Sequence, residues 1–259
     1  MRTLAIGAAL SGALALTALV VPSAQADEIW DGGVTITDVT VNGGKPIVVG
    51  TTNTVTFTGS VTATDPDGIQ IAAFTVVHGS GEDDPDLVSL APAGNKHTCA
   101  AVDATTTTCG ETITVNPHDL TKNAYAGAWN VSVFAFDKAD GGSSISHYTK
   151  AYVKRYAKLT VNASPEPVTK GRTITVTGKL TRANWETHDY RGYTGQTAKL
   201  QFRKAGSSTY TTVKNVTTDS HGNLKANVTA SADGYWRYVF AGTTTTGTAT
   251  AAGDYVDVH

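Results

Sequence analysis

The stretch Val55-Thr-Phe57-Thr-Gly59-Ser-Val61-Thr62 alternates strictly along its length. Its apolar or small residues fall on one side and its hydroxyl residues on the other, which is the period of a half-buried strand. A similar stretch, Ile174-Thr-Val176-Thr-Gly178-Lys-Leu180-Thr181, follows 119 positions later, and each is preceded by a short echo, Val39-Thr-Val-Asn42 and Leu159-Thr-Val-Asn162. The sequence therefore predicts two similar units in tandem, each organised around a central strand.

The first 26 residues have the features of an export signal. Arg2 supplies a positive start, residues 4–21 are apolar and small, and Ala24-Gln-Ala26 is an A-x-A cleavage site. A membrane anchor is the alternative reading, but Gly and Ser interrupt the apolar run and Pro22 closes it. We expect a secreted, extracellular mature chain that begins at Asp27.

The remaining sequence predicts an all-β protein. Short alternating runs separated by Gly, Pro, Asn and Asp dominate, and no stretch after residue 26 has the helical period. In the first unit we expect strands near 34–41, 54–64, 69–78, 86–91, 96–101, 108–115, 128–137 and 144–155. In the second we expect strands near 158–163, 172–182, 196–204, 209–216, 223–230, 235–241 and 249–258.

The chain divides near residue 156, with opposite charge on its two halves. Residues 27–156 hold 7 Lys or Arg and 15 Asp or Glu, a formal charge of −8, whereas residues 157–259 hold 12 and 7, a formal charge of +5. These charges either help two domains to pack or give each domain its own partner, a cation for the first and an anionic surface for the second. Both readings stay open at this stage.

The only two cysteines, Cys99 and Cys109, are expected to form a disulfide. An exported chain meets an oxidising compartment, and the spacing is too long for a C-x-x-C redox or metal pair. The bond would close a short hairpin.

The second unit resembles the Ig-like modules of secreted actinobacterial proteins. It carries their pattern at Gly195, Leu200, Phe202, Tyr210, Val213, Thr218-Asp219, Gly222, Asp233-Gly234 and Trp236-Arg237. The first unit is similar to bacterial Ig-like domains in its Thr64-Asp-Pro-Asp-Gly-Ile69 loop and its Trp129–Asp137 strand, departing from the pattern at Phe136 and at Asp140-Gly-Gly. The resemblance implies two β-sandwiches. From its own alternation, the strand at 128–137 is expected to pair with the strand at 54–64 at the centre of the first one, with Trp129 in the core; the alternative is that Trp129 is an exposed ligand platform. The resemblance implies no catalytic residue, because such sandwiches host many roles.

Four acidic residues are candidate metal ligands in the first unit. Asp65 and Asp67 follow one central strand, and Asp137 and Asp140 follow the other. In an Ig-like sandwich these two loops lie at the same pole, so the carboxylates converge, and Ca²⁺ takes oxygen ligands from such loops. The alternative is ordinary turn chemistry, because D-P-D-G and D-x-x-D-G are also turn sequences.

The segment 185–193 is a candidate ligand-binding loop. It does not alternate and is expected to be a long loop after a core strand, where Trp185, Tyr190, Arg191 and Tyr193 could stack on a sugar or an anionic polymer. The alternative is that these aromatic side chains fold back as a lid over the sandwich end.

The sequence predicts no enzyme, because it contains none of the usual catalytic motifs. We expect a non-enzymatic binding or structural protein, stabilised by Ca²⁺ if the acidic pole is a metal site. One alternative is a binding protein for carbohydrate or cell-wall polymer that uses the second unit. Another is an inhibitor of a secreted enzyme, presented on residues 79–86 or 185–193. Nucleic acid is not expected as a partner, and no apolar stretch after residue 26 approaches the roughly 20 residues that span a membrane.

Overall fold

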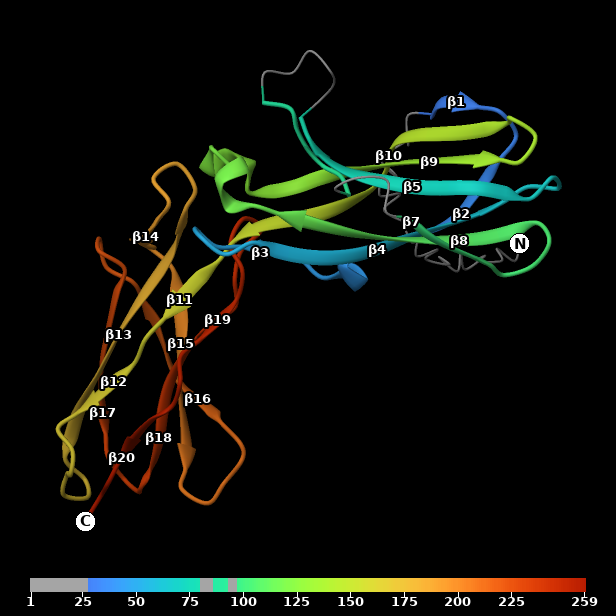
Figure 1. The fold of residues 1–259 in the computed structure, drawn as a ribbon. Helices are drawn as coiled ribbons and strands as arrows, with labels where there is room; N and C mark the ends of the chain where they lie inside the picture. Colours follow the sequence, from blue (N-terminus) through green and yellow to red (C-terminus); the bar gives the residue numbers. More distant parts are fainter. Residues whose placement is uncertain (1–27, 80–85, 93–96) are drawn as a thin grey trace, which may run out of the picture.

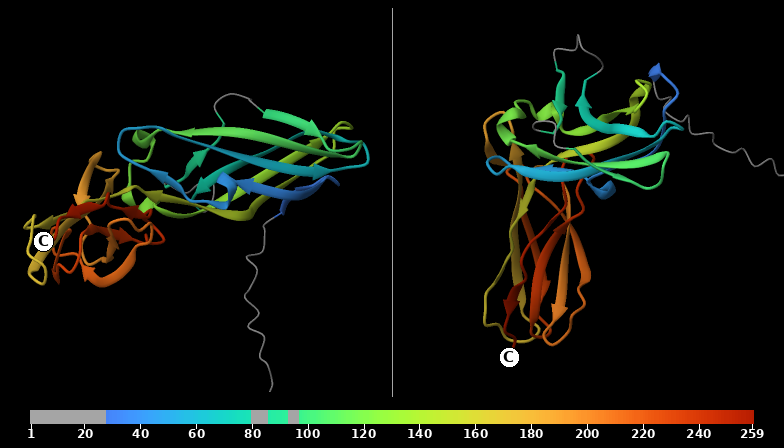
Figure 2. Two further views of the ribbon diagram at one scale, coloured as in Figure 1. Left: turned by 90° about the horizontal axis from the view of Figure 1, so that it is seen from below. Right: turned by 45° about the vertical axis from the view of Figure 1, so that its right-hand side comes forward.

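The computed structural model describes residues 28–79, 86–92 and 97–259, and the expected signal segment lies outside these ranges. Strands of residues 28–155 form one pair of sheets and strands of residues 157–256 form another (Figure 1). The two resulting sandwiches are set at a steep angle to each other, and the C-terminus lies at the end of the second sandwich away from the first (Figures 1 and 2). Within the described ranges, no helix is long and apolar enough to cross a membrane.

The first sandwich consists of a four-stranded and a six-stranded sheet. The four-stranded sheet has the order β2 (Thr35–Val41), β4 (Val55–Thr64), β8 (Thr106–Val115) and β7 (His97–Ala101). The larger sheet has the order β1 (Glu28–Asp31), β10 (Gly142–Arg155), β9 (Gly127–Asp137), β5 (Ile69–His78) and β6 (Val88–Leu90), with β3 (Ile47–Val49) parallel to β10. Three short 3-10 helices complete the unit: η1 (Asn42–Gly44), η2 (Pro117–Asp119) and η3 (Asn123–Tyr125).

The second sandwich consists of two five-stranded groups. In the first group, β13 (Thr173–Asn184) pairs with β11 (Ala157–Leu159), β12 (Asn162–Ser164), β14 (Asp189–Gly192) and β17 (Asn223–Thr229). The second has the order β16 (Thr211–Thr217), β15 (Thr197–Lys204), β18 (Gly234–Phe240) and β19 (Ala249–Thr250), with β20 (Asp254–Val256) also paired to β18. In both units the strand order is that of an Ig-like sandwich, so the expected all-β fold of tandem Ig-like domains is confirmed.

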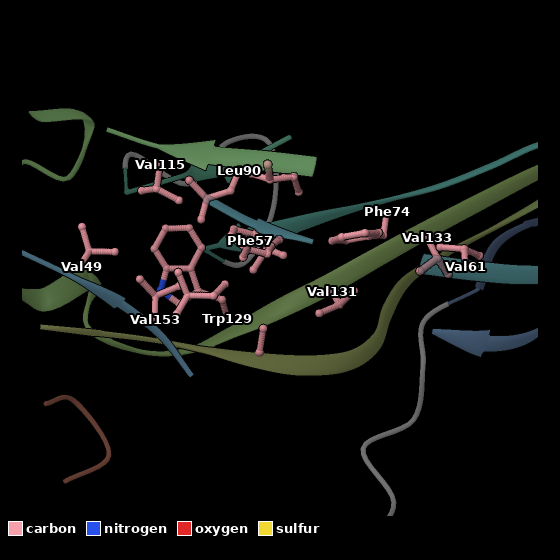
Figure 3. Close-up of a cluster of buried hydrophobic side chains, with 14 of the residues drawn as sticks. Val49, Phe57, Val61, Phe74, Leu90, Val115, Trp129, Val131, Val133 and Val153 are labelled. Atoms are coloured by element: carbon pink, nitrogen blue, oxygen red, sulfur yellow. The ribbon is translucent and has the colours of Figure 1, made fainter. Parts of the chain in front are cut away.

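The first core lies between β4 and β9, which face each other from opposite sheets. Phe57 and Val61 of β4 meet Trp129 and Val133 of β9 across the sandwich, and all four are buried (Figure 3). Trp129 is in the core as predicted, and its indole N–H donates to the carbonyl of Tyr125 at 2.6 Å. The expected pairing of these two strands is wrong: β9 instead hydrogen-bonds to β5 and β10.

The glycine shared by the two repeated stretches has the same packing reason in both units. A Cβ on Gly59 would collide with the ring of Phe74, and a Cβ on Gly178 would collide with the ring of Tyr238. Each aromatic side chain comes from the opposite sheet and is fully buried. The glycine repeated in the two stretches thus marks the point where an aromatic side chain of the opposite sheet packs against the central strand.

Candidate functional site

Three carboxylates meet at the end of the first sandwich that lies away from the second (Figure 1). Asp65 and Asp67 follow the end of β4, and Asp137 is the last residue of β9. Each offers an oxygen, and these oxygens all lie within 4.8 Å of one another. Asp65 and Asp137 are buried and Asp67 is exposed, so the cluster opens toward solvent on one side.

The same side chains hold the two turns together. Oδ1 of Asp65 accepts a hydrogen bond from the backbone N–H of Asp67 at 2.8 Å. Oδ1 of Asp137 accepts from the N–H groups of Ala139 and Gly141 at 2.7 and 2.8 Å. Asp65 and Asp137 therefore stabilise ordinary turns and also belong to the carboxylate cluster, so the two interpretations of these residues are compatible. Because a hard cation needs six to eight oxygens, carbonyl groups or waters would have to complete a site here.

Asp140, the fourth predicted ligand, is not part of this cluster. It occupies the left-handed backbone region at φ 68°, which turns the chain between β9 and β10. A cationic side chain also reaches this pole, since Nζ of Lys138 lies beside Gly68 of the first turn. The structure thus brings together three of the four predicted carboxylates and places an internal ammonium group near them.

Trp185 does not lie on a ligand face. Its side chain is 0% exposed and belongs to the core of the first sandwich, although the residue follows β13 of the second. The indole N–H points to the carbonyl oxygens of Val49 and Gly50, at 3.3 and 3.1 Å. Residues 185–193 form the tip and second strand of the β13–β14 hairpin rather than a long loop, so Trp185 takes the inward position that was the alternative to stacking on a ligand.

The other three predicted ligand-binding residues point to separate places. Tyr193 is buried beneath the guanidinium of Arg182, 3.9 Å from its ring centre. Arg191 is exposed and pairs with Asp189 at 2.8 Å. Tyr190 has the ammonium of Lys158 3.5 Å over its ring. With Trp185 buried, the four residues do not form one stacking surface.

Tyr190 instead lines a groove between the two sandwiches. The groove has a volume of about 400 Å³. Its walls are Val48, Gly50, Thr51–Val55, Tyr156, Lys158 and Tyr190. Tyr156 is 45% exposed and meets Tyr190 edge to face. Hydroxyl and amide groups on one wall and two tyrosines with a lysine on the other are suited to a sugar or a small anion.

The joint combines neutral amide groups with charged side chains. Asn123 of the first sandwich donates to the side-chain carbonyl of Asn184 at 2.7 Å and accepts from the backbone N–H of Trp185 at 3.0 Å. The buried Arg155 donates from Nε to the carbonyl of Ala183. Burial and the nearby charge of Arg182 lower its pKa to about 10. The ion pairs between described residues each lie within one sandwich. Across the joint, the carboxylate of Glu186 accepts from the backbone N–H of Asn123 at 3.0 Å, and its charge acts on Arg155.

Sequence reasoning missed a cluster on the outer surface of the second sandwich, which we term the Arg–Tyr face. It comprises Arg203 on β15, Tyr235 and Arg237 on β18, Tyr255 on β20, and Tyr210 just before β16. The alternation of polar and apolar residues along β15 and β18 was visible in the sequence. The strand register, which brings the outward residues side by side, was not.

One predicted feature falls partly outside the described residues. Residues 80–85, which contain most of the acidic loop offered as an inhibitor segment, are not described, while Asp86 pairs with Lys122. The other such segment, 185–193, lies at the joint. The predicted disulfide between Cys99 and Cys109 is confirmed and joins the facing strands β7 and β8.

Comparison with known proteins gives no family. No protein-family model matches the chain, and no curated protein matches it. Similar solved structures include three N-terminal domains of the outer capsid protein Hoc of bacteriophage RB49, with 13% identity, 87% of this chain and 70% of that chain covered, and a TM-score of 0.31. The D00-D0 domain of Intimin has 10% identity, coverages of 85% and 99%, and a TM-score of 0.28. The ectodomain of mouse nectin-like molecule 4 has 12% identity, coverages of 85% and 64%, and a TM-score of 0.26. Such low scores carry no argument, and the fold assignment rests on the strand order above.

Proposed function

We propose that the chain is an exported, non-enzymatic binding protein in which two Ig-like sandwiches act as one rigid unit. The observation that carries this proposal is the position of Trp185, a residue of the second sandwich that completes the core of the first. A joint of this kind limits hinge motion and holds the surfaces of both domains in a fixed relation. Fixed surfaces suit a protein that binds or spaces extracellular partners rather than one that closes over a substrate.

We further propose that the acidic pole binds Ca²⁺ and thereby stabilises the first sandwich. The support is the convergence of Asp65, Asp67 and Asp137, two of them buried. Carboxylates this close repel one another unless a cation is bound, and loop oxygens of this kind suit a hard metal.

Thermal unfolding with Ca²⁺ and with chelator tests the metal site. A ligand that binds only the folded state at 100 times its Kd adds about 2.7 kcal/mol, so Tm should rise on adding Ca²⁺. Asp67→Asn should abolish the rise because it removes a charged ligand without changing side-chain size. Asp140→Asn is the matched control and should keep the rise, since Asp140 lies outside the cluster. An unchanged Tm with Ca²⁺, or a full response in Asp67→Asn, would exclude this site.

A second candidate function is carbohydrate or wall-polymer binding, favoured by the groove between the sandwiches. Tyr156 and Tyr190 offer aromatic rings there, and Lys158 offers a cation. Retention of the protein on isolated bacterial cell walls, chitin and cellulose tests this function. Tyr156→Ala should weaken retention. Tyr152→Ala removes a similarly exposed tyrosine from the first sandwich and should not. Equal retention of the two variants would exclude the groove as the binding site.

A further inference from the structure

The Arg–Tyr face lies on the outer surface of the sheet formed by β16, β15, β18 and β20. Strand register places Arg203, Tyr235 and Tyr255 opposite one another on three neighbouring strands. Arg237 is two residues beyond Tyr235 on β18, so its side chain points to the same side of the sheet. The buried residues between them, such as Trp236, point into the core. The face is therefore fixed by the backbone of a regular sheet.

Aromatic rings and guanidinium groups stack across this face in a continuous row. The guanidinium of Arg237 lies 3.6 Å from the ring centre of Tyr210. That of Arg203 lies 4.1 Å from Tyr235 and 5.2 Å from Tyr210. The rings of Tyr235 and Tyr255 are 5.1 Å apart, and Tyr255 is 40% exposed. Stacking on a ring fixes a guanidinium plane while its N–H edge remains available to an anion.

Neutral acceptors hold both arginines in place. Nε of Arg237 donates to the side-chain oxygen of Gln201 at 2.9 Å, and Nη1 of Arg203 donates to the carbonyl of Ser207. Within the described part of the chain, neither guanidinium belongs to an ion pair. Two stacked cations without a carboxylate partner form a local excess of positive charge on a flat, partly aromatic surface.

The two edges of the Arg–Tyr face differ in charge. Lys199, exposed on β15 and on the same side of the strand as Arg203, extends the positive charge on the Arg203 side. The opposite edge is acidic: burial and the carboxylates of Asp233 and Asp257 raise the pKa of Tyr255. An anionic group is therefore favoured over β15 and β18, while an uncharged ring is favoured over Tyr255.

We propose that the Arg–Tyr face binds an acidic polysaccharide. Arg203 and Arg237 would pair with its carboxylate or phosphate groups, and Tyr235 and Tyr255 would stack on its sugar rings. This inference rests on the proposed binding function and names a ligand class for it. An acidic protein is the less suitable partner, because the alternation of rings and cations matches a chain in which rings and anions alternate.

Titration calorimetry with soluble polymers tests the proposal. The probes are polygalacturonate, which carries carboxylates, and purified wall teichoic acid, which carries phosphates. The references are methyl-esterified polygalacturonate, which keeps the sugar chain without the charge, and poly-γ-glutamate, which keeps the charge without the sugar. We expect binding to one or both probes and at least about tenfold weaker binding to both references. Absence of binding to both probes, or equal binding to poly-γ-glutamate, would overturn the proposal.

Variants locate the site. Arg203→Gln with Arg237→Gln should weaken binding by about tenfold or more, because two charge-assisted contacts are lost. The matched control, Lys179→Gln with Lys225→Gln, removes the same charge from β13 and β17 on the other sheet and should change binding little. Arg237→Lys keeps the charge but not the planar fork and should bind more weakly than the wild type.

Two further readouts separate the proposal from its alternatives. Tyr255→Ala should reduce affinity for the sugar polymer without changing the response to salt, because it removes a ring and no charge. If both double variants weakened polymer binding equally, binding would depend only on the net charge of the protein, and the Arg–Tyr face would be excluded as the site. Near-ultraviolet circular dichroism checks that each variant is folded. The Ca²⁺-dependent shift in Tm is measured separately from polymer binding. A negative result for polymer binding is therefore distinguishable from a negative result for the metal site.

Discussion

Glu111 illustrates at the scale of one residue how an Ig-like core can carry charge. It lies on β8, is buried, and points between the sheets. Its Oε1 accepts the backbone N–H of Phe74 at 3.2 Å and lies 3.0 Å from Nδ1 of His97, while Oε2 has no hydrogen-bond partner. Burial raises the pKa of this carboxyl above its usual 4.5, against the opposing effects of His97 and the Phe74 N–H.

The sign of this shift predicts a pH dependence. Because the folded pKa is the higher one, the contribution of Glu111 to stability is full below about pH 4.5 and is lost as pH rises through the folded pKa. Glu111→Gln, which is neutral throughout, should therefore gain stability relative to the wild type as pH rises from 4 to 7. The free energy of unfolding in urea at several pH values measures this difference.

Asp103 supplies a control of opposite sign. It is exposed, and hydrogen bonds from Thr105 and Thr106 lower its pKa. Its contribution is present above the unfolded pKa and is lost as pH falls through the folded one. Asp103→Asn should therefore lose stability relative to the wild type as pH rises. Parallel pH profiles for the two variants would contradict the assignment of Glu111.

The sequence predicted the acidic cluster but not the position of Trp185, and the difference has a physical reason. The carboxylates of Asp65, Asp67 and Asp137 were found because each follows a strand end, and strand order fixes which ends meet. Trp185 was misplaced because its environment depends on the second sandwich docking against the first. No local pattern encodes that contact, although an isolated tryptophan among polar residues is a signal that something covers it.

At the scale of elements, the long strands and the short β7 were predicted well, whereas the short β3 and β14 were missed. The expected strands at 54–64 and 69–78 coincide with β4 and β5 to within one residue. β3 was missed because three residues between a proline and a glycine are too few to display a period. β14 was missed because its four residues are mostly polar, and two of its partners on β13, Ala183 and Asn184, lie beyond the expected strand end at residue 182.

The β7–β8 hairpin is the element whose stability is most open to a direct test. Its disulfide closes a loop of sequence separation 10, and Cys109 is buried while Cys99 is exposed. Loop-closure entropy assigns such a bond about 2–3 kcal/mol. The reduced and alkylated protein should therefore unfold at lower urea than the oxidised protein, with loss of hairpin protection in hydrogen exchange. Identical urea midpoints for the two forms would show that strand pairing alone holds this hairpin.

At the scale of the whole molecule, the two halves carry opposite net charges and meet through amide groups and a few charged side chains. Asn123, Asn184 and Trp185 contribute to the contact beside Arg155 and Glu186. Tyr156 is the only residue between β10 and β11. Among the described residues, no ion pair joins the acidic half to the basic half. This arrangement favours separate partners for the two domains, a cation at the acidic pole and a polyanion on the Arg–Tyr face.

Trp185 decides whether the molecule behaves as one unit. Trp185→Ala should cost about 3–5 kcal/mol, since it removes a fully buried ring from the first core. It should also uncouple the domains, so that urea unfolding splits into two transitions, reported by Trp129 in the first sandwich and Trp236 in the second. Trp185→Phe keeps most of the volume and loses only the bonds to Val49 and Gly50, so it should cost less and keep one transition.

The control for this experiment is Trp30→Ala, which removes an exposed indole from the first sandwich and should cost less than about 1 kcal/mol. Two transitions already present in the wild type would show that the sandwiches unfold independently. A single transition in Trp185→Ala at wild-type stability would show that the joint does not depend on this ring. Either result would remove the basis for a rigid two-domain unit, because Trp185 is the largest side chain that the second sandwich adds to the core of the first, beside Ala183 and Tyr190.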